Sequence, residues 1–181
     1  LYGKRVAIAS GESVALREAG DVLRAHRVPL SALATPPMEM PVEEALAALE
    51  RGEQDAVIMT APAPAPALRN FAVSSAVRLL QLDADAVALI TTGNTNYVAV
   101  TIPVQTYPGQ AKAVATVGVA AMLVSTERVP TSETEGLLRR VFADMDFMSQ
   151  GHPMGAMIKP ASARRGLTLP LRPTSRRSSP A

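Results

Sequence analysis

The chain has 181 residues, of which 48% are hydrophobic and 19% charged, and its net charge is +2. This balance supplies enough apolar material for one sizeable domain or two small lobes, and the charge is too small to indicate a nucleic-acid partner. An aromatic content of 3% argues against carbohydrate or nucleobase recognition, and the absence of cysteine excludes disulfide scaffolds, thiolate zinc sites and thiol nucleophiles.

The first 60 residues alternate between strand and helix patterns. Residues 5–9 form a short apolar run that is typical of a strand buried on both faces, and a helical pattern follows it and ends at Pro29. A second strand is predicted at 30–34, a helix at 41–52 and a third strand at 55–60. This β-α-β-α-β order predicts an α/β fold with a parallel sheet and flanking helices.

The proline-rich segment 61–67 (APAPAPA) follows the carboxyl end of the third predicted strand. Open α/β sheets bind their ligands at that edge, so we interpret the segment as a rigid loop over a crevice. A strand is predicted next at 77–82, then a helix at 83–90 and a turn at 91–95.

The second half of the chain begins with an extended strand at 97–104 and a turn at 107–110. A long β-type run follows at 115–126. A capping box formed by Ser132 and Glu135 predicts the start of a helix with an apolar stripe, and a short helix is expected at 154–163. The stripe comprises Leu138, Val141, Phe142 and Met145. These elements are too sparse to close a core alone.

An ordered set of short motifs resembles the TAXI family of solute-binding subunits of TRAP transporters. The set runs over nearly the whole chain, and TYPGQ at 106–110 is its most specific piece. The other pieces are Gly3, Lys4, Arg5, Val6, Ser13, Gly52, Asp55, Ala56, a Thr-Ala and proline-rich loop from Thr60, Ile102, Pro103, His152, Pro153, and the segment 169–173.

The resemblance implies an exported protein with a signal peptide and a two-lobed, class II periplasmic-binding-protein-like fold. It implies a complete α/β lobe at 1–96, a hinge-crossing strand at 97–104 and the C-terminal part of the other lobe, with a flexible tail, at 105–181. The lobe of residues 105–181 is expected to be incomplete, lacking its N-terminal part. Because Leu1 is not an initiator methionine, we expect that further sequence belongs upstream.

By the same resemblance, the protein is expected to be periplasmic or otherwise extracytoplasmic and to act as a monomer, not as an enzyme. It would capture a small polar solute, either a carboxylate or an amino-acid-like molecule, and deliver it to a TRAP-type membrane permease. No cofactor, metal or nucleic acid is implied. The expected ligand-binding residues are Ser10, Gly11, Glu12, Ser13, Thr60, Ala61, Pro62, Ala63 and Tyr107.

Each candidate contact has a structural alternative. The segment 10–13 could be a plain helix N-cap, and Tyr107 could pack a hinge while its loop makes a tight turn. The family commonly has Gly-Ser-Gly-Thr where this chain has Glu-Ser-Val-Ala at 12–15, which adds a negative charge and removes part of an anion-binding loop. The solute could therefore be neutral or cationic, or the site could be degenerate.

Two other functions stay open. The chain could be a ligand-sensing or structural periplasmic domain of a larger membrane-associated protein. A remote alternative is a serine hydrolase that uses Ser13, with His152 and either Asp144 or Asp146 as partners, although the motif lacks a second glycine. His26 and His152 lie far apart and without a nearby carboxylate cluster, so they form no recognisable metal site.

Overall fold

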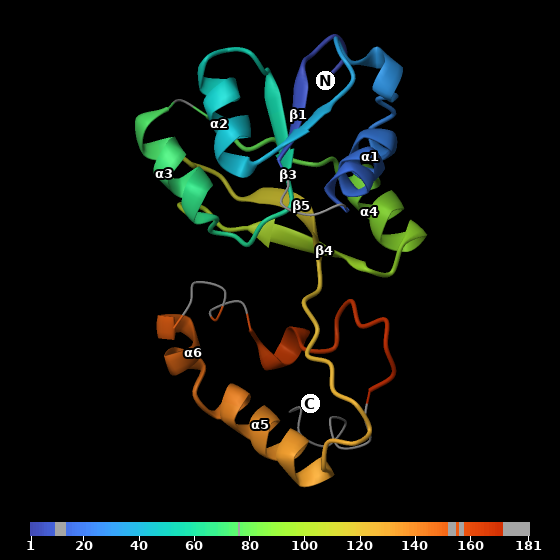
Figure 1. The fold of residues 1–181 in the computed structure, drawn as a ribbon, viewed down its shortest axis with the longest axis vertical. Coiled ribbons are helices and arrows are strands. Elements are labelled where there is room, and N and C mark those ends of the chain that lie inside the picture. The colour runs from blue at the N-terminus through green and yellow to red at the C-terminus, as the bar shows by residue number, and fades with distance from the viewer. Residues whose placement is uncertain (10–13, 76, 152–154, 156–157, 172–181) are drawn as a thin grey trace. The chain divides into compact units, whose positions relative to one another are not determined.

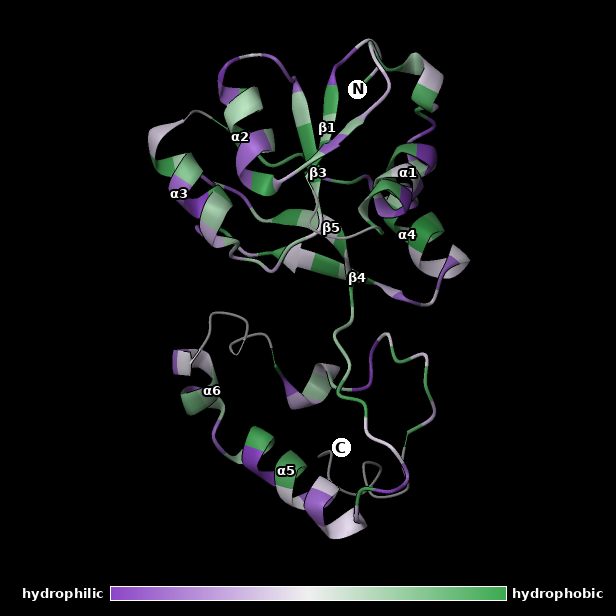
Figure 2. Cartoon of the chain, viewed as in Figure 1, coloured by the Kyte–Doolittle hydropathy of each residue, from purple (hydrophilic) through white to green (hydrophobic). Residues whose placement is uncertain are grey.

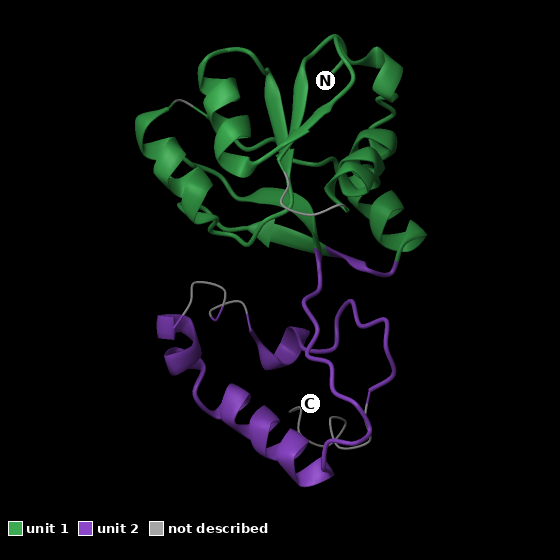
Figure 3. Cartoon of the chain, in the orientation of Figure 1, with its two compact units in different colours: residues 1–94, 99–118 green, residues 95–98, 119–181 purple. Residues whose placement is uncertain are grey.

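The computed structural model describes residues 1–9, 14–75, 77–151, 155 and 158–171 (Figure 1). The chain divides into two compact units, shown in separate colours in Figure 3. Unit 1 comprises residues 1–94 and 99–118, and unit 2 comprises residues 95–98 and 119–181. The expected lobe boundaries at 1–96, 97–104 and 105–181 stay a prediction.

A three-stranded parallel sheet lies at the centre of unit 1. Its strands are β1 (Val6–Ala9), β2 (Met38–Met40) and β3 (Ala56–Met59), in the order β2-β1-β3. In the register, Ala7 of β1 pairs with Met38 of β2 and with Val57 of β3. The predicted α/β class with a parallel sheet and flanking helices is therefore confirmed.

Helices cover both faces of this sheet (Figure 1). On one face, α1 (Ala15–Ala25) contacts α4 (Ala84–Gly93), and on the other α2 (Val42–Glu50) contacts α3 (Pro66–Ser74). Each βαβ connection needs a helix to return the chain to the same edge of the sheet, which explains why the helices alternate with the strands.

The side chains of β1 alternate between the two helical layers. Ala7 and Ala9 pack with the alanines of α2, whereas Val6 and Ile8 belong to clusters that include residues of α1. Figure 2 shows β1 as a hydrophobic strand between these helices. Because both faces of the strand are buried, the run at 5–9 lacks the polar alternation of a half-exposed strand.

The predicted strand at 30–34 is wrong. A 3-10 turn, Leu30–Ala32, occupies that position, and the second strand of the sheet is β2, eight residues later. The backbone of the turn segment instead bonds to the residues before β1. Gly3 N–H donates to the Ala32 carbonyl (2.7 Å), and Ala34 N–H donates to the Lys4 carbonyl (3.0 Å). These isolated bonds stop short of a ladder, so the apolar run there does not make a strand.

The prediction of a strand at 77–82 is also wrong. Residues 77–82 pair with no described strand. One backbone hydrogen bond, from Leu82 N–H to the Ala115 carbonyl (3.0 Å), joins the segment to β5 (Val114–Val119). The helix α3, which the sequence analysis did not predict, lies just before it. Proline suits the first turn of a helix because its missing N–H would be unpaired there anyway, so Pro66 begins α3 rather than extending the loop.

Two further strands, β4 (Tyr97–Ile102) and β5 (Val114–Val119), form a two-stranded sheet. Both are shorter than the runs at 97–104 and 115–126 that we predicted. Gly118 of β5 faces Val100 of β4 so closely that an added Cβ would lie 3.0 Å from a Val100 methyl carbon. The helix predicted at 83–90 continues into the turn expected at 91–95, since α4 ends at Gly93.

Unit 2 contains α5 (Thr131–Ala143), α6 (Met145–Gly151) and a 3-10 turn, Pro160–Ser162. The predicted capping box is wrong, because α5 begins after Pro130 without a side-chain cap, and Ser132 lies inside the helix. Asp144 separates α5 from α6 and accepts a hydrogen bond from Phe147 N–H (2.8 Å). The described part of 154–163 contains the 3-10 turn in place of the expected helix. Among the described residues, no helix is both long and apolar enough to cross a membrane.

A charged pair joins the chain just before β1 to the chain just before β3. The Arg5 guanidinium donates two hydrogen bonds to Asp55 (3.0 and 2.9 Å), and Arg5 N–H donates a third (2.8 Å). The Arg5 carbonyl in turn accepts from Asp55 N–H (2.9 Å). These hydrogen bonds hold the pKa of the Asp55 carboxyl well below its usual range. The pair therefore sets the start of the β1–β3 register.

Replacing Ile8 tests the core of unit 1. Ile8 is 1% exposed, so Ile8→Ala is expected to lower the free energy of unfolding by about 2–5 kcal/mol through lost burial and a residual cavity. Urea unfolding followed by circular dichroism measures this change. The matched control is Leu89→Ala in α4, where the side chain is 60% exposed and the expected change is within about 0.5 kcal/mol. Equal losses for the two variants would contradict the described core.

The Arg5–Asp55 pair makes a prediction about pH. Because folding lowers the pKa of Asp55, the pair contributes stability above the pKa of the unfolded chain and loses it as the pH falls through the folded value. The stability difference between the wild type and Asp55→Asn is therefore expected to shrink between about pH 5 and pH 2. Unfolding midpoints across that range measure the difference. Glu39→Gln, at an exposed carboxylate of β2, is the control and should show no such trend.

Candidate functional site

The carboxyl end of β3 carries a short polar contact. Thr60 directly follows β3 and is exposed, and its hydroxyl donates to a carboxylate oxygen of Glu18 (2.6 Å). Glu18 lies in the first turn of α1 and is half-buried. A carboxylate is therefore held at the edge of the sheet where α/β proteins bind ligands, and its remaining lone pairs can accept from a hydroxyl or an ammonium group.

The loop after Thr60 leads directly into α3. Ala61 and Pro62 are exposed and Ala63 is half-buried, so the first two are open to solvent at the end of β3. The Ala63–Pro64 peptide bond is cis. Ala65 is buried and forms the N-cap of α3. The loop is thus a shorter connection between a strand and a helix than the predicted segment 61–67, and the rigidity that its prolines indicate stays a prediction.

Tyr107 connects a second loop to this one. Its side chain is 6% exposed, and its hydroxyl accepts a hydrogen bond from Ala65 N–H (2.9 Å). The bond joins residues 42 positions apart and satisfies a backbone donor that would otherwise be buried without a partner. Tyr107 therefore packs between the loop at 104–111 and the start of α3. Its role as a ligand contact stays a prediction.

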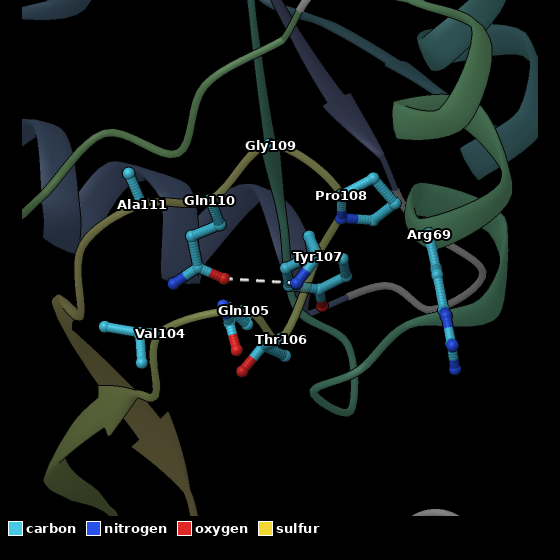
Figure 4. Close-up of a pocket in the computed structure, with 9 residues that line it drawn as sticks. All are labelled: Arg69, Val104, Gln105, Thr106, Tyr107, Pro108, Gly109, Gln110 and Ala111. Carbon is cyan, nitrogen blue, oxygen red and sulfur yellow. Dashed lines mark hydrogen bonds between the residues drawn. The ribbon is translucent and has the colours of Figure 1, made fainter.

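The amide of Gln110 braces the loop at 104–111 from within. Its nitrogen donates to the carbonyls of Pro103 and Lys112 (2.9 Å each), and its oxygen accepts from Tyr107 N–H (3.2 Å; Figure 4). The backbone turn closes with a bond from Gln110 N–H to the Tyr107 carbonyl (3.1 Å). A single side chain thus fixes three points of the loop.

The loop at 104–111 and Arg69 of α3 line an open depression of about 710 Å³ (Figure 4). Its volume lies within the range of ~300–1,000 Å³ that is usual for small-molecule sites. The lining residues are Arg69, Val104, Gln105, Thr106, Tyr107, Pro108, Gly109, Gln110 and Ala111. Apart from Arg69, its polar groups are neutral amides and hydroxyls, and they alternate with apolar side chains, so the depression suits a small molecule with polar and apolar parts.

Arg69 supplies the charge of this depression. It extends from α3 and is exposed, and its side chain makes no hydrogen bond or ion pair with any residue in the described part of the chain. Its guanidinium therefore keeps its donors available for an anion. The other lining residues carry no formal charge.

The expected ligand-binding residues fall into three groups. Ser10, Gly11, Glu12 and Ser13 lie outside the described residues. The loop from Thr60 to Ala63 lies at the predicted edge of the sheet but does not line the depression, whereas Tyr107 lines it. The bond from Ala65 to Tyr107 is the link between these two regions.

Three side chains at these regions were missed by the sequence analysis: Glu18, Arg69 and Gln110. A signal for Arg69 was present, because a proline followed by Ala67, Leu68 and Phe71 fits the first turns of a helix. Nothing in the local sequence indicates that Glu18 meets Thr60, or that Gln110 bonds to the backbone of its own loop.

Other candidate chemistry finds no support among the described residues. They contain no group of three or more histidine, cysteine or acidic residues that could hold a metal ion. His26 ends α1, is half-buried, and lies 3.4 Å from a carboxylate oxygen of Asp83, which suits a structural residue. Ser13 and His152 lie outside the described residues, so the hydrolase alternative stays untested.

Comparison with known proteins gives one result. A family model described as the NMT1-like family matches residues 1–178. Among curated proteins, none matches the chain.

Removing the Tyr107 hydroxyl tests the contact between the two loops. Tyr107→Phe leaves the buried Ala65 N–H without an acceptor, so the free energy of unfolding is expected to fall by about 1–3 kcal/mol. Chemical denaturation measures the change. The control is Tyr2→Phe, because the exposed Tyr2 hydroxyl donates to the Arg27 carbonyl (2.6 Å) where water can replace it. A loss for Tyr107→Phe no larger than for Tyr2→Phe would show that the buried bond is not formed.

Proposed function

The chain belongs to the NMT1-like family, and from that premise we propose that it is an extracytoplasmic solute-binding protein. In this proposal it captures a small polar solute, either a carboxylate or an amino-acid-like molecule. It then delivers the solute to a TRAP-type membrane permease. The proposal involves no chemical step, no cofactor and no metal, and the protein acts as a monomer.

The family supports the general part of the proposal. It is a periplasmic-binding-like family, and its model matches nearly the whole chain, residues 1–178. The parallel sheet with helices on both faces is the α/β class that such proteins use. The ordered motifs shared with the TAXI type, above all TYPGQ at 106–110, support the transporter-specific part.

One observation of the structure carries the solute-binding proposal: the braced depression of about 710 Å³ beside the start of α3. Its neutral hydrogen-bonding groups and single cation suit a small polar ligand rather than a large apolar one. The loop that forms it is held by Gln110 and by the Tyr107 hydroxyl, so the site is largely formed before any ligand arrives.

The carboxyl end of the sheet supports the same proposal. Thr60, Ala61 and Pro62 are exposed there, and Glu18 places a carboxylate beside them. We propose that the loop from Thr60 to Ala63, the segment 10–13 and Tyr107 contact the solute. An amino-acid-like molecule carries both an ammonium and a carboxylate; Glu18 supplies a carboxylate at the edge of the sheet, and Arg69 supplies a guanidinium at the depression.

Thermal unfolding of the full chain in the presence of candidate solutes tests the proposal. The panel comprises monocarboxylates, dicarboxylates, amino acids and small amines. A ligand that binds only the folded state is expected to raise the unfolding midpoint, by the equivalent of about 2.7 kcal/mol at a hundredfold excess over its Kd. Isothermal titration calorimetry then gives the Kd of each compound that raises the midpoint.

The control for this experiment is sodium chloride at matched ionic strength, which separates specific binding from general salt effects. Specific stabilisation by one class of solute supports the proposal. Failure of every class at millimolar concentration would contradict it and favour a structural role. Solute uptake into liposomes that contain a TRAP-type permease, measured with and without the chain, tests the transport step separately.

A further inference from the structure

We propose that Arg69 binds the carboxylate of the solute, and that the depression beside it selects small monocarboxylates. The inference rests on the proposed solute-binding function and adds a residue and a ligand class to it. Arg69 comes from α3, a helix outside the segments 10–13 and 60–63 and the turn at 107–110 to which the sequence analysis assigned ligand contacts.

The charge of the lining is the first argument. Arg69 is the one charged residue among the nine that line the depression. Its side chain makes no ion pair within the described ranges, so no carboxylate of those residues competes for it. A guanidinium presents two parallel N–H donors that match the two oxygens of a carboxylate. An arginine whose side chain is unpaired, at a depression with neutral hydrogen-bonding groups, is therefore suited to such a ligand.

The second argument is that Arg69 has a fixed position relative to the loop. Arg69 N–H donates to the Ala65 carbonyl (2.9 Å), and Ala65 N–H donates to the Tyr107 hydroxyl (2.9 Å). Ala65 thus links the backbone of Arg69 to the loop at 104–111, which supplies the other lining residues of the depression. Gln110 holds that loop in turn. The guanidinium therefore extends from a backbone that does not have to be ordered when a ligand binds.

The neutral groups of the lining limit the rest of the ligand. Gln105 is exposed, and its side-chain amide makes no hydrogen bond to the described residues, so it can donate to a ligand oxygen. The Thr106 hydroxyl already donates to the Pro103 carbonyl (2.8 Å) and can only accept from the ligand. Val104, Pro108 and Ala111 offer apolar contact. This set suits one carboxylate on a short body with a hydroxyl or apolar substituent.

Because Arg69 is the one cation of the lining, we expect the depression to favour ligands with one carboxylate over ligands with two. A second carboxylate in the same depression would meet no positive group among the lining residues. It would remain in water or be placed beside neutral acceptors, and neither arrangement adds affinity. We therefore expect a dicarboxylate to bind no more tightly than a monocarboxylate of similar length.

Isothermal titration calorimetry with the full chain tests the inference, at constant ionic strength. The probes are butyrate, 2-hydroxybutyrate and benzoate, the corresponding neutral amides, and succinate. The monocarboxylates are expected to bind more tightly than their amides and at least as tightly as succinate. Arg69→Gln is expected to weaken the binding of the monocarboxylates by about tenfold or more and to remove their advantage over the amides.

The matched control is Arg78→Gln. Arg78 is also exposed, lies in unit 1 and makes no ion pair in the described part, but it does not line the depression. The Arg78→Gln substitution removes the same charge from the same unit but away from the depression, so the affinities for the carboxylates should stay unchanged. Arg69→Lys keeps the charge without the paired donors and should give an intermediate affinity. Circular dichroism and the unfolding midpoint of each variant verify that the fold is kept.

The possible failures are distinguishable. If some class of solute binds the wild type but Arg69→Gln binds it equally well, the inference is overturned while the proposed function stands. Tighter binding of succinate, the amides or small amines than of every monocarboxylate overturns the inference in the same way. If no solute of any class binds the wild type, the proposed function fails together with the inference.

Discussion

Burial of β1 on both faces is the constraint on which unit 1 depends. A strand between two helical layers can carry no polar side chain without an unpaired group in the core, so each of its four residues is apolar. Two of them, Ala7 and Ala9, are small and pack with the alanines of α2. Small residues on both sides let the helix lie close to the sheet. The edge where the sheet ends, and the loops that leave it, are positioned by this packing.

The parts of the fold that could be predicted are those in which periodicity and burial agree. The apolar run at 5–9, the helical stripes that follow it and the third strand all appear where they were expected, because each needs one face or two faces covered. The strand at 30–34 was misplaced because an apolar run beside a proline satisfies its backbone equally well with a few isolated hydrogen bonds. Periodicity reports burial, whereas a strand also requires a partner in register.

The candidate site could be predicted only in part. The rule that ligands bind at the carboxyl edge of a parallel sheet directs attention to the loop after β3, whose role in binding stays a prediction. It contains no information about Glu18, whose contact with Thr60 joins distant segments, or about Arg69, which lines the depression from a helix that the sequence analysis did not predict. Gln110 was quoted within a motif, but its three hydrogen bonds become visible only when the turn is folded. Helix propensity alone could have identified α3 and placed Arg69 on it.

The bond between the Tyr107 hydroxyl and Ala65 N–H has a consequence for the rate and heat of binding. Two walls that are already joined lose little conformational entropy when a molecule settles between them. Under the proposed function, association at such a surface would proceed in one step, at a rate set by diffusion and by rotation of the ligand and of Arg69. A slow, concentration-independent phase would have to come from rearrangement elsewhere in the chain. The hydrogen bond thus fixes the shape of this part of unit 1 without the help of a ligand.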